Sequence, residues 1–152
     1  TYRPLLAGTI PISIDNRDSD LDIVCCIEDP AAFAGLLKVL YGGYAGFGLI
    51  EDIGSHVVVC NFSAYGEKIE IYASPVPTHL SNAFLHMIAE EKLLRLGGDE
   101  FRGRIIALKS NGLKTEPAFA EVLALSGNPY EEILQFVDMD DERLRNLLSS
   151  AY

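Results

Sequence analysis

Two aspartates, Asp20 and Asp22, stand one residue apart inside an apolar run and constrain this chain more than any other feature. In a β-strand, residues i and i+2 point to the same face, so both carboxylates share one side while Leu21 and Ile23 bury the other. Carboxylates are poor strand formers, and two of them repel each other. A fold that holds them side by side is therefore expected to do so for a divalent cation, Mg²⁺ or Mn²⁺.

The length and composition describe a globular chain. With 152 residues, the chain has room for one domain with a sizeable core. No apolar run approaches the roughly 20 residues that span a bilayer, so no membrane partner and a cytoplasmic location are expected. The chain begins at Thr1 rather than at methionine, and a few native residues are therefore expected to precede it.

The charge balance bears on the partners. The sequence holds 22 Asp and Glu against 12 Lys and Arg, a formal net charge of -10. Such a surface repels a polyphosphate backbone and gives little counterion release, so nucleic acid is not expected as a substrate. Cys25, Cys26 and Cys60 have no metal-ligand spacing and are interpreted as reduced core thiols.

The first half of the chain reads mainly as strands. Leu5–Ala7 is predicted to end a short strand, and Gly8-Thr9 to form a turn before a loop that reaches Asp18. A glycine-rich stretch that ends at Ile53 carries no strand prediction. The other predicted elements are a strand over 21–27, a helix over 31–41, and two strands over 56–62 and 68–73 joined by a hairpin turn.

From Pro77 onward the pattern indicates helices. The apolar spacing and the capping residues predict helices over 80–96, 100–111 and 115–125, another from 129 and a last one to 149. The expected N-caps are Thr115, Asn128, and Asp140 or Asp141. We therefore predict an α+β fold in which residues 1–76 form a small mixed sheet with flanking helices and residues 77–152 form a helical half packed on it as one unit.

Three short motifs in order carry a resemblance. Gly8-Thr9, Asp20-Leu21-Asp22 and Ile69-Glu70-Ile71 resemble the DNA polymerase beta-like nucleotidyltransferase superfamily. The whole chain also looks like a small bacterial family, a domain of unknown function, within that superfamily. The resemblance implies metal-dependent transfer of a nucleoside monophosphate from a nucleoside triphosphate to an acceptor, with pyrophosphate leaving. The charge favours a small-molecule or protein acceptor.

The resemblance also implies roles for single residues. Asp20, Asp22 and Glu70 would be the catalytic residues and would hold Mg²⁺ or Mn²⁺, while Glu70 could also take the acceptor proton. The backbone amides of Gly8 and Thr9 would approach the phosphates. Further candidates for the nucleotide are Ser19 and Arg17, and for the base or acceptor they are Asn82 and His86.

Other interpretations of these residues stay open. Asp20 and Asp22 could cap or solvate a strand edge, and Glu70 could be an exposed cross-strand partner of a lysine. Asn82, His86 and Glu90 share one helical stripe, which could equally be a partly buried polar stripe. For the whole protein, the alternatives are an inactive module that binds a nucleotide or metal, or an interaction protein such as the partner of a toxin.

Overall fold

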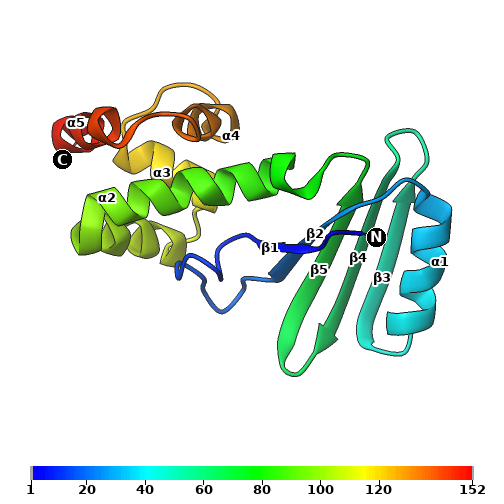
Figure 1. The fold of residues 1–152 in the computed structure, drawn as a ribbon. Helices are drawn as coiled ribbons and strands as arrows, with labels where there is room; N and C mark the ends of the chain where they lie inside the picture. The colour runs from blue at the N-terminus through cyan, green and yellow to red at the C-terminus, as the bar shows by residue number, and fades with distance from the viewer. Residues whose placement is uncertain (1, 152) are drawn as a thin grey trace. The chain divides into compact units, whose positions relative to one another are not determined.

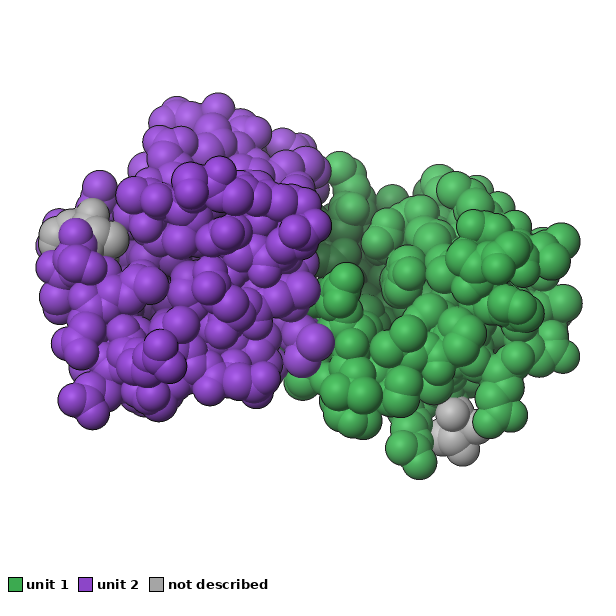
Figure 2. Space-filling model, turned by 90° about the horizontal axis from the view of Figure 1, so that it is seen from above, with its two compact units in different colours: residues 1–11, 19–84 green, residues 12–18, 85–152 purple. Residues whose placement is uncertain are grey.

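The computed structural model describes residues 2–151 and divides into two compact units, which Figure 2 shows in separate colours. Unit 1 comprises residues 1–11 and 19–84, and unit 2 comprises residues 12–18 and 85–152. The boundary therefore falls after Phe84, inside a helix, rather than at residue 76. The loop of residues 12–18 groups with the helical unit.

Unit 1 is built on a five-stranded mixed sheet (Figure 1). Its strand order is β1-β2-β5-β4-β3, with β2 and β5 parallel and the other neighbours antiparallel. The strands are β1 (Leu5–Ala7), β2 (Leu21–Cys26), β3 (Ala45–Asp52), β4 (Val57–Ala64) and β5 (Glu67–Ser74). The predicted strands at 5–7, 21–27, 56–62 and 68–73 are thus confirmed.

Helix α1 (Pro30–Tyr41) covers one face of this sheet. The Asp29 side chain caps its first turn by accepting a hydrogen bond from the Ala32 amide, and Pro30 occupies a first-turn position where no amide donor is needed. A buried core lies between α1 and this face of the sheet, and α1 does not cover the opposite face. The core residues are Cys25, Ile27, Phe33, Ala34, Leu37, Val58, Cys60, Phe62, Ile71 and Ala73.

The glycine-rich segment forms strand β3, where no strand was predicted. Phe47 and Leu49 are half-buried at the period-two spacing of a strand, but glycine at 46 and 48 interrupts the apolar pattern. The pairing register with β4 shifts between Ala45 and Gly48. As an edge strand, β3 needs fewer apolar residues than a central strand, which explains why its signal was weak.

The β4–β5 hairpin turns at Tyr65 and Gly66, which have φ angles of 56° and 91°. A tyrosine strains the backbone at such a position. Its side chain is 98% exposed, so no packing contact offsets this strain. Tyr65→Asn is expected to raise the free energy of unfolding by about 0.5–1 kcal/mol, since asparagine favours this turn. Urea denaturation measures the change. Tyr65→Ala removes the ring without relieving the strain and should not stabilise; equal stabilisation by both variants would contradict the backbone explanation.

Unit 2 is helical. Helix α2 (Asn82–Ser110) contains a kink at Gly98, where φ is 72° and ψ is -165°, so the two predicted helices on either side of Gly97-Gly98 are confirmed. The 3-10 helix η1 (Thr78–Leu80) precedes it in unit 1, and α3 (Thr115–Val122), α4 (Pro129–Glu132), the 3-10 helix η2 (Ile133–Phe136) and α5 (Asp141–Ala151) follow. No helix among the described residues is long and apolar enough to cross a membrane.

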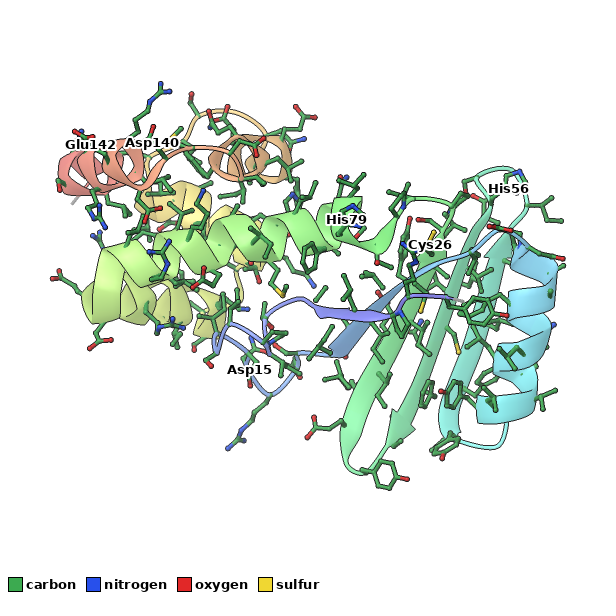
Figure 3. All side chains as sticks on the ribbon, viewed as in Figure 1. Asp15, Cys26, His56, His79, Asp140 and Glu142 are labelled. Carbon is green, nitrogen blue, oxygen red and sulfur yellow. The ribbon has the colours of Figure 1, made fainter. Side chains whose placement is uncertain are left out.

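The capping predictions hold for two of the three helices. The Asn128 side chain accepts a hydrogen bond from the Tyr130 amide, and Asp140 accepts one from the Arg143 amide at 2.8 Å (Figure 3). Thr115, however, is the first helical residue of α3, and Lys114 is its N-cap. The Thr115 hydroxyl instead accepts a hydrogen bond from Nζ of the buried Lys109 at 3.0 Å.

The three cysteines are free thiols. Cys25 and Cys60 belong to the core, as predicted, whereas Cys26 is half-buried and lies at the end of β2 (Figure 3). Since neighbouring residues of a strand point to opposite faces, Cys25 faces α1 and Cys26 faces the other side. The prediction of a core position was therefore wrong for Cys26.

Candidate active site on the sheet face opposite helix α1

A row of side chains crosses the sheet of unit 1 and includes two carboxylates. The register pairs Ala7 with Asp22, Asp22 with Glu70, Glu70 with Asn61, and Asn61 with Gly48. Paired residues on neighbouring strands point to the same face. The row therefore lies on the face opposite α1, with Asp22 and Glu70 side by side in the only parallel pair of strands described.

Asp20 adds a third carboxylate next to this row. It precedes Asp22 by two residues, just before β2 begins. Burial raises the pKa of Asp22 to about 6, with further contributions from the negative charges of Glu70 and Asp20. Burial and the charge of Asp20 also raise the pKa of Glu70. These three groups thus lie close enough to repel one another.

The carboxylate cluster has no ion-pair partner among the described residues. The ion pairs within residues 2–151 involve other acids, and none includes Asp20, Asp22 or Glu70. The interpretation of Glu70 as the partner of a lysine is therefore not what the structure shows, because its neighbours across the sheet are Asp22 and Asn61. The cluster carries a local excess of negative charge that a bound cation would relieve.

The carboxylates match a divalent cation in their chemistry. Carboxylate oxygens are the hard ligands that Mg²⁺ and Mn²⁺ prefer. Within residues 2–151, however, no three or more His, Cys, Asp and Glu side chains stand in an arrangement that could by itself hold a metal ion. The donor type and the unrelieved repulsion fit such a cation, while the side chains are not closed into a finished ligand cluster.

Gly8 is in close contact with this cluster. It follows β1 directly, has a φ of 76°, and a Cβ at this position would overlap the Asp22 carboxylate, lying 3.0 Å from its Cγ and closer still to Oδ2. The expectation was that glycine leaves room for a phosphate. The structure gives a different reason, since the missing side chain leaves room for Asp22.

The other residues expected to contact the nucleotide lie in different units. The Thr9 hydroxyl donates a hydrogen bond to Ser19 Oγ at 3.3 Å, which links the turn after β1 to the segment before β2. Arg17 is exposed and belongs to residues 12–18, which group with unit 2. A role for Arg17 at the carboxylates stays a prediction.

A cavity of about 410 Å³ in unit 1 opens on the carboxylates. Asp22 and Glu70 line it together with apolar side chains from β2, β5 and the connection from β5 to α2, among them Val24, Tyr72 and Leu80. Its volume lies in the range of roughly 300–1,000 Å³ that is typical of small-molecule sites. Carboxylates with an apolar wall are suited to a ligand that has a charged part and a less polar part.

The helical stripe of Asn82, His86 and Glu90 is divided between the units. Asn82 lines the cavity of unit 1, which keeps it a candidate for ligand binding. His86 lies in unit 2, where Nδ1 is 3.2 Å from Glu116 Oε1 and Nε2 is 2.8 Å from the Tyr130 carbonyl oxygen. Both ring nitrogens therefore already have partners, and the interpretation as a partly buried polar stripe describes His86 better.

Sequence reasoning assigned no role to Asn61, although it lies beside Glu70 in the carboxylate row. A usable signal was present in the hairpin. Counting outward from the two-residue turn at Tyr65 and Gly66 places Asn61 opposite Glu70, and the buried alternation of Val58, Cys60 and Phe62 places Asn61 on the other face. Its amide can accept and donate hydrogen bonds next to the carboxylates.

Comparison with solved structures identifies the class of fold. The chain is similar to a cytoplasmic RNA terminal U-transferase, with a TM-score of 0.51 and 10% identity over 86% of this chain and 39% of that one. It is also similar to the polymerase core of TRAMP, an RNA surveillance complex, with a TM-score of 0.47 and 15% identity over 97% of this chain and 50% of the other. The likeness to the U-transferase shows that the sheet and its helices have a nucleotidyltransferase fold. The chain spans half or less of each of these two structures.

The sequence itself assigns the chain more narrowly. Residues 1–136 match the model of DUF4269, a domain of unknown function, and the chain belongs to this family. No curated protein matches the sequence.

Proposed function

We propose that this protein is a metal-dependent nucleotidyltransferase that moves a nucleoside monophosphate from a nucleoside triphosphate to an acceptor hydroxyl. The observation that carries the proposal is the pairing of Asp22 with Glu70 on an open sheet face, with Asp20 close enough to raise the pKa of both. The nucleotidyltransferase fold supports it, because Asp22 and Glu70 lie in strands of that fold and Asp20 directly precedes β2. Asp20, Asp22 and Glu70 would hold Mg²⁺ or Mn²⁺.

The reaction follows from the chemistry of these groups. The acceptor oxygen forms a bond to the α-phosphorus, while the bond from the α-phosphorus to the bridging oxygen breaks and pyrophosphate leaves with that electron pair. Glu70 lies on the sheet face beside Asp22, where its carboxylate can take the proton of the acceptor hydroxyl. A bound divalent cation supplies charge stabilisation for the triphosphate and the leaving group.

The position of Gly8 supports an assignment of the two substrates to opposite sides of Asp22. Gly8 touches Asp22 on the β1 side, whereas Glu70 lies on the β5 side of Asp22. We assign the triphosphate to the side of Gly8 and Thr9, because backbone amides of a turn can bind phosphate oxygens, and the acceptor to the side of Glu70. The net charge of -10 favours a small-molecule or protein acceptor over a nucleic acid.

Titration of each of the four nucleoside triphosphates, together with manganese, into the protein in a calorimeter tests the proposal. The wild type is expected to bind at least one of them, and Asp20→Asn/Asp22→Asn to lose at least about tenfold in affinity, because ligands to the cation are removed. Circular dichroism checks that the variant is folded.

A matched control removes the same number of negative charges elsewhere in unit 1. Glu51→Gln/Glu67→Gln changes two exposed acids in β3 and β5 that alternate onto the sheet face away from the carboxylate row. This variant should bind as the wild type does. The proposal is refuted if the wild type binds none of the four triphosphates with manganese or magnesium, and the alternative of an interaction protein then takes its place.

A further inference from the structure

A second row of side chains lies directly alongside the carboxylate row on the same sheet face. The register pairs Leu5 with Val24, Val24 with Tyr72, Tyr72 with Val59, and Val59 with Ile50. Each of the three central residues is two positions along its strand from a member of the carboxylate row, and such residues share a face. An apolar row therefore borders the carboxylates across all five strands.

This apolar row is accessible at its centre and at its far end. Tyr72 is 37% exposed and Ile50 is 65% exposed, whereas large apolar side chains on a sheet face are usually covered. The connection from β5 to α2 adds Val76 and Leu80, which are 44% and 53% exposed and line the same cavity as Tyr72. Three of these exposed apolar side chains, Tyr72, Val76 and Leu80, thus line one cavity together with Glu70, whereas Ile50 lies two strands away on β3.

We infer that this apolar surface binds the acceptor, and that the acceptor is a small organic hydroxyl compound with an aromatic or apolar portion next to its hydroxyl. The inference rests on the proposed function, which places the triphosphate on the Gly8 side of Asp22. A compound seated on Tyr72 with its apolar portion directs its hydroxyl toward Glu70, two residues away on the same face. A small open-chain polyol such as glycerol has no apolar portion to match this surface.

The chemistry of Tyr72 fits this role. Its ring offers a flat apolar surface, and an aromatic ligand can pack against it in an offset or edge-on arrangement. Asn61 and Ser74 flank this part of the face, the first in the carboxylate row and the second in the lining of the cavity. Polar groups at the margin of an apolar surface fix the orientation of a small ligand.

The test uses two probes that differ in their apolar portion, 2-phenylethanol and glycerol. Ligand-observed NMR titrations measure their binding to the wild type, to Tyr72→Ser and to Tyr65→Ser, which removes a tyrosine from the exposed hairpin tip. The wild type is expected to bind 2-phenylethanol and not glycerol, Tyr72→Ser to lose at least about fivefold in affinity, and Tyr65→Ser to bind as the wild type does.

The nucleotide titration separates this inference from the proposed function. Tyr72→Ser should keep manganese–triphosphate binding. If the wild type binds 2-phenylethanol through Tyr72 but no triphosphate, the apolar site stands and the proposed reaction fails. If Tyr72→Ser lowers triphosphate affinity as much as probe affinity, the surface holds the nucleobase and the inference is overturned. Equal binding of both probes, unaffected by Tyr72→Ser, also overturns it.

Discussion

Gly8→Ala is expected to weaken manganese–triphosphate binding at least about tenfold and to lower the free energy of unfolding by about 1–3 kcal/mol. A φ of 76° costs an alanine about 1–2 kcal/mol, and the new Cβ would overlap the Asp22 carboxylate. Asp22 must then move away from the turn after β1. Because small displacements of a ligand side chain weaken metal sites strongly, we expect a loss of at least about tenfold in affinity by calorimetry.

Gly48→Ala is the matched control for this substitution. Gly48 occupies the same row of the sheet, at its β3 end, and a Cβ there would meet no atom within 4 Å. Its stability and its nucleotide binding should match those of the wild type. If Gly8→Ala bound the triphosphate with wild-type affinity, the close approach of Gly8 and Asp22 would have no part in ligand binding.

Glu90→Gln is expected to remove a steep loss of stability between about pH 4.5 and pH 8. Glu90 is 3% exposed in unit 2, and burial raises its pKa to about 8, with Glu116 adding to the rise and His86 and Lys109 opposing it. The unfolded chain releases this proton near the ordinary value of 4.5, so unfolding releases a proton between about pH 4.5 and pH 8. The wild type therefore loses stability as the pH rises through this window.

Urea denaturation at pH 5, 7 and 9 measures this effect. At pH 5 the wild type and Glu90→Gln should differ little, and at pH 9 the variant should be more stable by about 3–5 kcal/mol, since each unit of pKa shift corresponds to about 1.4 kcal/mol. Glu91→Gln, at the neighbouring exposed position, should keep the pH dependence of the wild type. A variant that lost stability with pH as steeply as the wild type would show that Glu90 is not the responsible group.

The predictions from sequence held where the signal was local. Asn128 and the Gly97-Gly98 pair mark helix ends through their own backbone and side-chain chemistry, and the structure confirms these boundaries. Thr115 was wrong as an N-cap because its hydroxyl binds Lys109, which lies six residues earlier and is buried in the folded chain. The burial of that lysine depends on tertiary packing, which the residues around the cap do not reveal.

In the candidate site, too, only the features that depend on neighbouring residues in the sequence could be predicted. The alternation around Asp22 indicated which face it uses, but the neighbours of Glu70 depend on the strand order of the whole sheet. The sequence also did not predict the unit boundary after Phe84 or the grouping of residues 12–18 with helices far along the chain. The roles of Asp20, Asp22 and Glu70 in catalysis stay predictions.

The parallel pairing of β2 and β5 makes the candidate site depend on a contact between distant parts of the chain. Every other neighbouring pair of described strands is antiparallel, and α1, β3 and β4 separate β2 from β5 in the sequence. Bringing Asp22 next to Glu70 therefore costs the entropy of closing that long loop. A nascent or truncated chain that ends before β5 lacks the acidic pair altogether.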